Sequence, residues 1–205
     1  MLHLTILPLL FACGGAPPPP PPAPLAPVQE GDLALILPTG EDLVGCPASS
    51  SYVKLDVAEG GAEAWCDRSG VKHGNYMKTW PSGLERERGV WVNGMQDGSW
   101  TTTYEDGATA SRGNWDNGRQ IGAWTWYWPN GRKKEEGDYV NGRRLGEWVE
   151  YGEDGRKLAE GMYRNGARDG TWTWYQPSTD GVIDRVERWS GGQVVETQKA
   201  PAAVN

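Results

Sequence analysis

The sequence is poor in the residues and motifs that carry most enzyme chemistry. Its 205 residues include three cysteines, two histidines and a single phenylalanine. Cysteines without nearby histidines or further cysteines do not make a metal-ligand set. We find no serine nucleophile elbow, phosphate-binding loop, dinucleotide fingerprint or HExxH motif. The sequence therefore predicts a protein that is not an enzyme and that needs no cofactor and no metal.

Positive charge and long apolar runs are also scarce. Lysine and arginine total 20 against 27 acidic residues, which gives a net charge of −7. No basic stripe stands out, so we expect no nucleic-acid partner. No apolar stretch is long enough to span a bilayer.

Glycine and tryptophan are abundant instead, with 29 and 12 residues. They recur with a fixed period of 24 residues, most clearly in 98–121, GSWTTTYEDGATASRGNWDNGRQI. A fixed period in this range is typical of repeat architectures. The glycine that opens each unit and the aromatic residue two positions later are Gly74, Tyr76, Gly98, Trp100, Gly122, Trp124, Gly146, Trp148, Gly170 and Trp172.

The residue pattern of each unit predicts a hairpin of two short strands joined by a tight turn. If residues 106–107, Asp-Gly, are the two central turn residues, Trp100 lies opposite Gly113, and Trp124 lies opposite Gly137 in the next unit. Each aromatic ring would then cover the glycine across from it. A three-residue turn would shift this register by one. A second set of aromatic residues lies an odd number of positions from the first set, which in a regular strand puts it on the opposite face. Either both faces carry aromatic residues or a bulge changes the face.

The repeated pattern G-x-W-x-x-Y-x-x-D/N-G-x₅-G-x-Y/W-x-N-G resembles the MORN-repeat variant of bacterial proteins, including the YwqK-like antitoxin family. The resemblance covers roughly residues 74–193. It implies an interaction or scaffold module without catalytic residues. The last unit departs from the pattern, because it gains two residues in 176–181 and has Glu187 where glycine is expected. Terminal repeats are often atypical.

The predicted fold class is all-β: an elongated antiparallel sheet or solenoid of stacked two-stranded hairpins with a 24-residue period and a small β N-terminal cap. We expect a signal peptide, a Pro-rich linker, a cap with a degenerate repeat, five repeats and a flexible tail. Their bounds are 1–12, 13–30, 31–73, 74–193 and 194–205.

The N-terminal segment resembles a bacterial lipoprotein signal. Residues 10–13, Leu-Phe-Ala-Cys, resemble a lipobox with Cys13 as the lipidated residue, although the segment before it has no lysine or arginine. The resemblance implies a cell-envelope protein, in an outer membrane and facing the periplasm or the surface. A soluble protein with an unusual N-terminus, or a start site placed too late, is the alternative. The following proline run favours an extended spacer.

The cap carries the remaining two cysteines. Residues 33–37 predict a short buried strand, and 52–57 with 64–67 predict a degenerate hairpin. An even pair in an oxidising compartment indicates a disulfide between Cys46 and Cys66, with two free buried thiols as the alternative. If Gly60 is near the turn, Cys66 faces about Val53. The segment around Cys46 must then lie on the other side of the Cys66 strand.

Three tryptophans outside the repeating series are the candidate binding patch: Trp126, Trp128 and Trp174. Exposed aromatics are favoured anchors in protein interfaces. We expect the partner to be another envelope or secreted protein, and the membrane to be reached only through the N-terminal anchor. Toxin neutralisation, binding of a carbohydrate or peptidoglycan, and a passive structural role are the alternatives.

Overall fold

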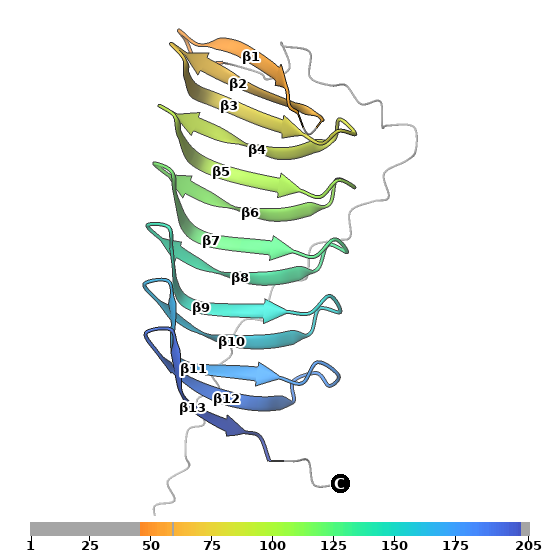
Figure 1. Ribbon diagram of the computed structural model, residues 1–205, viewed down its shortest axis with the longest axis vertical. Coiled ribbons are helices and arrows are strands. Elements are labelled where there is room, and N and C mark those ends of the chain that lie inside the picture. The colour runs from red at the N-terminus through yellow and green to blue at the C-terminus, as the bar shows by residue number, and fades with distance from the viewer. Residues whose placement is uncertain (1–45, 59, 202–205) are drawn as a thin grey trace, which may run out of the picture. The chain divides into compact units, whose positions relative to one another are not determined.

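The computed structural model describes residues 46–58 and 60–201, which form one open antiparallel sheet and contain no helix. The predicted all-β fold is confirmed. Each strand pairs with the next one in the chain (Figure 1). In these ranges no helix is long and apolar enough to cross a membrane. The strands are β1 (Ser51–Asp56), β2 (Ala62–Arg68), β3 (Val71–Thr79), β4 (Glu85–Val92), β5 (Met95–Thr103), β6 (Thr109–Asp116), β7 (Arg119–Tyr127), β8 (Lys133–Val140), β9 (Arg143–Tyr151), β10 (Lys157–Arg164), β11 (Ala167–Tyr175), β12 (Ile183–Ser190) and β13 (Gln193–Lys199).

Asn-Gly turns join successive strands at one side of the sheet, and we call this row of strand ends one edge. Asn117 and Gly118 have φ angles of 48° and 74°, the positive values that a two-residue hairpin turn requires. The Gly118 amide donates a 2.9 Å hydrogen bond to the carbonyl of Gln96 in the preceding hairpin. Equivalent bonds recur at the other Asn-Gly turns, so each turn is fixed to the hairpin before it.

On the other side of the sheet, the turns of the β3–β4, β5–β6, β7–β8 and β9–β10 hairpins have three residues rather than two, and the β11–β12 turn has five. Between β5 and β6 the Gly107 amide bonds the Tyr104 carbonyl at 3.0 Å, and the Tyr104 amide bonds the Ala108 carbonyl at 2.8 Å. This is the three-residue turn that ends in a glycine of positive φ, here 86°. The prediction of 106–107 as the two central residues was therefore wrong.

A β-bulge beside each of these turns restores the predicted register. In the β5–β6 hairpin the register shifts between Thr102 and Thr103, and beyond that point Trp100 lies opposite Gly113 as predicted. The same shift places Trp124 opposite Gly137. The extra loop residue and the bulge residue thus cancel, which is why the predicted pairing holds despite the different turn.

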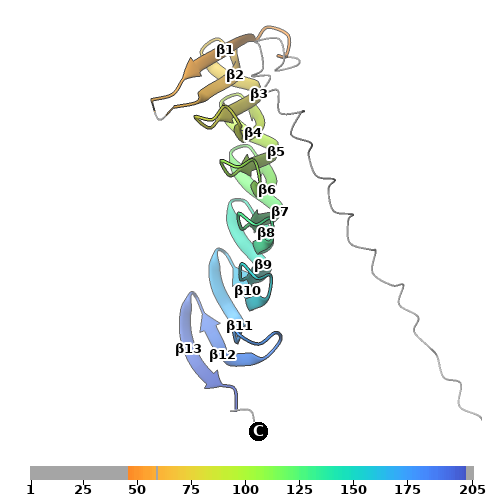
Figure 2. The same ribbon diagram turned by 90° about the vertical axis from the view of Figure 1, so that its right-hand side faces the viewer.

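The core is a column of aromatic rings on one face of the sheet. Trp148 and Trp172 are completely buried, and Trp100 and Trp124 nearly so. The prediction of which glycine lies beneath each ring was wrong. The Trp124 ring lies over Gly113 of the preceding strand and not over Gly137. Figure 2, in which the molecule is turned by 90°, shows that the strands are curved along their length.

A wide irregularity between β6 and β7 explains where the ring lies. Arg112 pairs with Thr125 and Asn114 pairs with Ile121, so Gly113 faces the three residues 122–124. Gly122 lies at the bend with a φ of 59°, a backbone conformation that residues with a Cβ rarely adopt. Glycine at this position therefore permits the bend. Trp124 is thereby brought across Gly113.

β1 and β2 form the hairpin expected of the degenerate repeat, and a disulfide joins Cys46 to Cys66 with a Cα–Cα distance of 5.4 Å. Cys66 lies opposite Tyr52, one residue from the predicted Val53. A Cβ on Gly74 of β3 would lie 2.6 Å from the ring of Pro47. The segment after Cys46 therefore lies on the β3 side of β2, as the sequence argument required.

The C-terminal end differs from the prediction. Residues 194–199, assigned to a flexible tail, form most of β13 and pair with β12, for example through Val186 and Gln198. The side chains of β13 are all exposed, so backbone pairing across a Gly-Gly turn is what places this strand. Cys13, the signal and linker in 1–30 and the predicted strand at 33–37 lie outside the described residues.

Candidate functional site

Trp126 belongs to the packing of the aromatic column. Its ring stacks on Trp124 with centroids 5.4 Å apart, and it lies 5.8 Å from Trp148. The side chain is half-buried and packs against the core. Trp126 therefore joins the buried rings of two consecutive hairpins.

Trp128 links neighbouring hairpin turns. Its indole N–H donates to the Tyr151 carbonyl at 3.0 Å, and Lys134 Nζ lies 4.6 Å from the ring centroid. The same link occurs one repeat earlier, where the Tyr104 hydroxyl donates to the Tyr127 carbonyl at 2.6 Å. Sequence reasoning missed this series, although Trp80, Tyr104 and Trp128 keep the repeat spacing.

Trp174 packs near Trp172, with centroids 6.2 Å apart, and its indole donates to Glu187 at 2.8 Å. It lies on β11, whereas Trp126 lies on β7, four strands and roughly 19 Å away. Trp174 thus lies apart from Trp126 and Trp128, which are two residues apart at the end of β7. Each of the three side chains has a packing or hydrogen-bonding role and is only partly buried, and their part in binding a partner stays a prediction.

Glu187 occupies the position where the other repeats have glycine. Its buried carboxylate accepts hydrogen bonds from Arg185 Nε at 2.8 Å and from the indoles of Trp174 and Trp189. Burial acts to raise the pKa of this carboxyl, but the hydrogen bonds from Arg185 and Trp174 outweigh it and hold the pKa below its ordinary value. Glu187 therefore closes the aromatic column with a charged network.

Arginines cover the outer side of the aromatic column. The Arg144 guanidinium lies 4.0 Å from the Trp148 ring centroid and bonds Glu135 at 2.9 Å. It also donates to the hydroxyls of Tyr139 and Tyr163, both at 3.4 Å. Arg168 repeats this arrangement one hairpin later, with Trp172 and Glu150. These two cations are occupied by internal contacts.

The opposite face also carries aromatic residues, which settles the alternative left open by the sequence. The Tyr151 hydroxyl donates to Glu136 at 2.8 Å, and Lys133 bonds the same carboxylate at 2.7 Å. Burial and the Glu136 carboxylate raise the pKa of Tyr151. The corresponding pair one repeat later raises the pKa of Tyr175 to about 12, first through its hydrogen bond to Glu160.

An apolar patch lies on this second face, near the edge formed by the Asn-Gly turns. We define the apolar patch as Val140, Leu145 and Met162, which are 48%, 39% and 44% exposed. Register places Leu145 opposite Asp138 and Met162 opposite Glu147. The three residues are therefore diagonal neighbours on consecutive strands, within reach of one ligand side chain.

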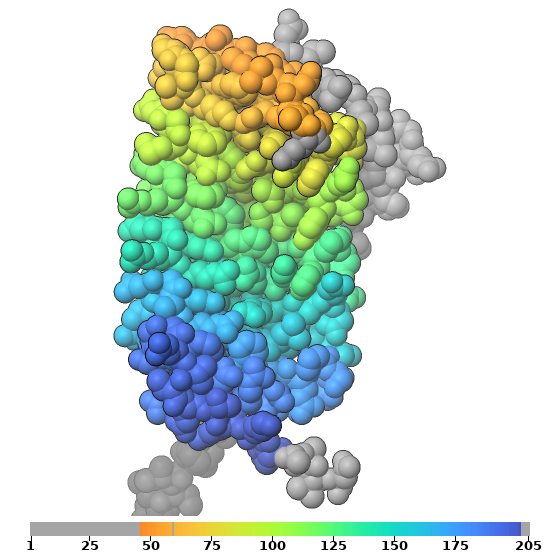
Figure 3. Space-filling view, viewed as in Figure 1, coloured from red at the N-terminus to blue at the C-terminus, as the bar shows by residue number. Residues whose placement is uncertain are grey.

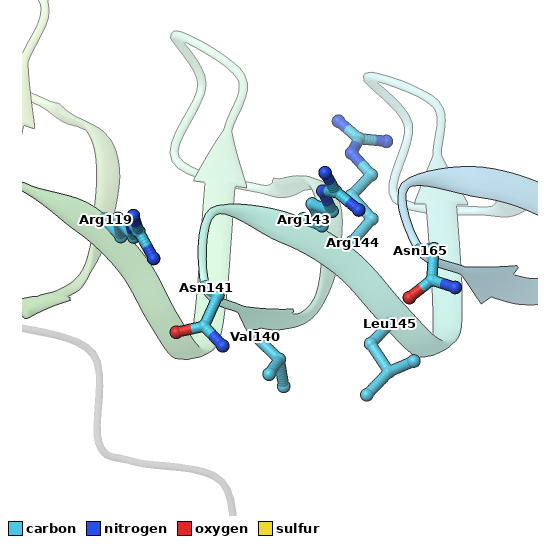
Figure 4. Close-up of a pocket in the computed structure, with 7 residues that line it drawn as sticks. All are labelled: Arg119, Val140, Asn141, Arg143, Arg144, Leu145 and Asn165. Carbon is cyan, nitrogen blue, oxygen red and sulfur yellow. The ribbon is translucent and has the colours of Figure 1, made fainter.

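A pocket of about 540 Å³ adjoins the apolar patch. In Figure 4 the side chains of Val140 and Leu145 extend to one side of the ribbon and Arg144 to the other. The space-filling view shows the successive hairpins as consecutive bands of the surface (Figure 3). In 46–58 and 60–201 no three His, Cys, Asp or Glu side chains are grouped to hold a metal. The pocket is lined by Arg119, Val140, Asn141, Arg143, Arg144, Leu145 and Asn165.

Comparison with known proteins identifies one repeat. Residues 120–141 match the family described as the MORN repeat variant. The match begins in β7 and ends at Asn141, so it spans one hairpin and the start of the next turn. No curated protein matched the chain. The hairpin that forms one wall of the pocket is thus a MORN-type repeat.

Proposed function

We propose that the chain is a non-catalytic binding module whose MORN-type repeats present the apolar patch to a protein partner. Repeats of this kind are generally found in protein-binding or scaffold modules. The finer proposal, that the partner is an envelope or secreted protein, rests on the lipobox-like sequence ending at Cys13. A tether there would confine the sheet to the cell envelope, and the Cys46–Cys66 disulfide is typical of exported proteins.

The observation that carries this proposal is the exposure of the apolar patch. Isolated exposed apolar residues are common, but three on consecutive strands beside a pocket are typical of a binding surface. Backbone pairing on both sides holds β8, β9 and β10 in place. A partner would therefore meet a preorganised surface, which lowers the entropic cost of association.

The test is to capture crosslinked proteins from native envelopes with the full-length chain and then to measure direct binding of the purified candidate. The triple variant Val140→Ser, Leu145→Ser, Met162→Ser should lose the captured protein and weaken its binding at least about tenfold. The control is Leu55→Ser with Val195→Ser, which removes apolar side chains of similar exposure from β1 and β13.

Equal binding by the wild-type chain and the triple variant would overturn the proposed binding surface. Recovery of cell-wall fragments alone would indicate a glycan-binding role. Capture of a toxin would indicate that this chain acts as its antitoxin. Metabolic labelling with a fatty-acid probe tests the anchor separately. Cys13→Ser should abolish that label, and labelling that persists would exclude Cys13 as the lipidated residue.

A further inference from the structure

Two exposed arginines occupy the same position in consecutive repeats. Arg119 and Arg143 each follow an Asn-Gly turn, and both line the pocket beside the apolar patch. Among the described residues neither has an ion-pair partner within 4.0 Å. Other repeats have Val71, Met95 and Ala167 at this position, so the pair is a local feature of this part of the sheet.

The backbone around both arginines is fixed. The Gly142 amide donates to the Gln120 carbonyl and the Gly166 amide to the Arg144 carbonyl, each at 2.9 Å. A Cβ on Gly142 would lie 3.9 Å from the Cβ of Arg119. The stems of the two arginines are therefore packed against turns of the next hairpin. Two strand spacings separate them, roughly 10 Å.

Neighbouring groups in the described residues form no ion pair with Arg119 or Arg143. Arg144, the third arginine of the pocket, is paired with Glu135 and packed on Trp148. Asp116 lies opposite Arg119 across the turn, and its carboxylate accepts a hydrogen bond from the Asn117 side chain and makes no ion pair with Arg119 within 4.0 Å. The pocket thus holds two available guanidinium groups in a chain whose net charge is −7.

We propose that the pocket binds carboxylate groups of an acidic segment of the protein partner, with Arg119 and Arg143 each holding one carboxylate. This proposal rests on the proposed function and names the chemistry of the partner. Planar guanidinium groups suit bidentate carboxylate binding. Val140 and Leu145 lie beside them and accept an apolar side chain from the same segment.

Geometry also defines the spacing in the partner. A segment in the extended polyproline II conformation advances about 3.1 Å per residue with three residues per turn, so carboxylates that lie on one face roughly 10 Å apart are three positions apart. The partner segment therefore has acidic residues at i and i+3 with an apolar residue between them. An anionic membrane surface is a poorer occupant, because it extends beyond the pocket and would also face the acidic remainder of the chain, whereas a short acidic segment meets mainly the two arginines.

The test is selection of random peptides on the immobilised full-length chain. Wild type should enrich peptides with acidic residues three apart, and Arg119→Gln with Arg143→Gln should lose this enrichment. Binding of a selected peptide, measured by fluorescence anisotropy, should weaken at least about tenfold in the double variant. The matched control is Arg88→Gln with Arg188→Gln, which removes the same charge from exposed arginines and should bind as wild type does.

Peptides without acidic enrichment, or equal binding by wild type and the Arg119/Arg143 double variant, would overturn the proposal. Inorganic phosphate and phosphatidylglycerol vesicles serve as separate probes. Arginine-dependent binding to vesicles without acidic peptide selection would assign the site to a lipid headgroup and also overturn it. If the protein captured from envelopes still depends on the apolar patch but not on the two arginines, the proposed function stands and the acidic specificity fails.

Discussion

The indole of Trp124 lies directly over Gly113, so that a Cβ atom on Gly113 would come within 2.2 Å of the ring. The same relationship joins Trp148 to Gly137 in the next hairpin. Gly113 has no positive φ, so space and not backbone conformation requires glycine there. At Gly98 the opposite holds, since φ is 70° and a Cβ would meet nothing within 4 Å.

Alanine substitutions separate these two requirements. Gly113→Ala should destabilise the protein by about 1–3 kcal/mol through overpacking against Trp124. Gly98→Ala should cost about 1–2 kcal/mol through backbone strain. In a Trp124→Leu background the first penalty should fall close to zero and the second should persist, as measured by urea unfolding. Equal penalties for Gly113→Ala in both backgrounds would exclude the ring contact as their source.

The hairpin register was predictable, but the positions of the rings were not. Alternation of side chains and the position of the Asp-Gly pair were enough to place Trp100 opposite Gly113, because the bulge and the longer turn cancel. Alternation assigns a side chain to a face of the sheet. It does not say toward which neighbouring strand the side chain leans, and that depends on the bend at Gly122.

The candidate site was harder to predict because it depends on contacts between hairpins. Spacing alone made Trp128 look like an exposed residue, whereas its N–H is bonded to the next turn. Arg119 and Arg143 do keep the 24-residue spacing, which was a usable signal. Their lack of internal partners follows only from the distances in the folded sheet.

Loss of the disulfide should loosen one end of the sheet only. Cys46 and Cys66 are 20 residues apart in sequence, and closing such a loop is worth about 3 kcal/mol by the chain-entropy estimate. The variant Cys46→Ser with Cys66→Ala should lose hydrogen-exchange protection in β1 and β2. Amides of β9 should keep theirs, because each hairpin contacts only its neighbours. A uniform loss of protection along the sheet would contradict this.

Arg144 should matter for stability, whereas its neighbour Arg143 should not. Arg144→Gln removes the contact with Trp148 and leaves Glu135 without its ion pair, at a cost of about 1–3 kcal/mol. Arg144→Lys should not restore stability, since an ammonium lacks the planar guanidinium that lies over the ring. Arg143→Gln, the control, should change the unfolding free energy by less than about 0.5 kcal/mol. Matching losses for Arg143→Gln and Arg144→Gln would refute the assigned contacts.

Glu187 should make stability depend on pH in the acidic range. Its folded pKa lies below the ordinary value of 4.5, so its ionised form stabilises the fold above about pH 4.5. That contribution is lost as the pH falls through the folded pKa and the carboxylate takes up a proton. Glu187→Gln should cost about 1–3 kcal/mol at neutral pH, because the bonds from Arg185, Trp174 and Trp189 lose their charged acceptor.

The pH dependence is checked by urea unfolding at neutral pH and at successive values below pH 4.5. Wild type should lose more stability on acidification than Glu187→Gln, which has no carboxyl to titrate at this site. Glu196→Gln is the control, since that exposed carboxylate lies 3.6 Å from Arg188 in a surface ion pair of little energetic weight. The same acid-induced loss in wild type and Glu187→Gln would show that other carboxyls, not this buried one, control the acid response.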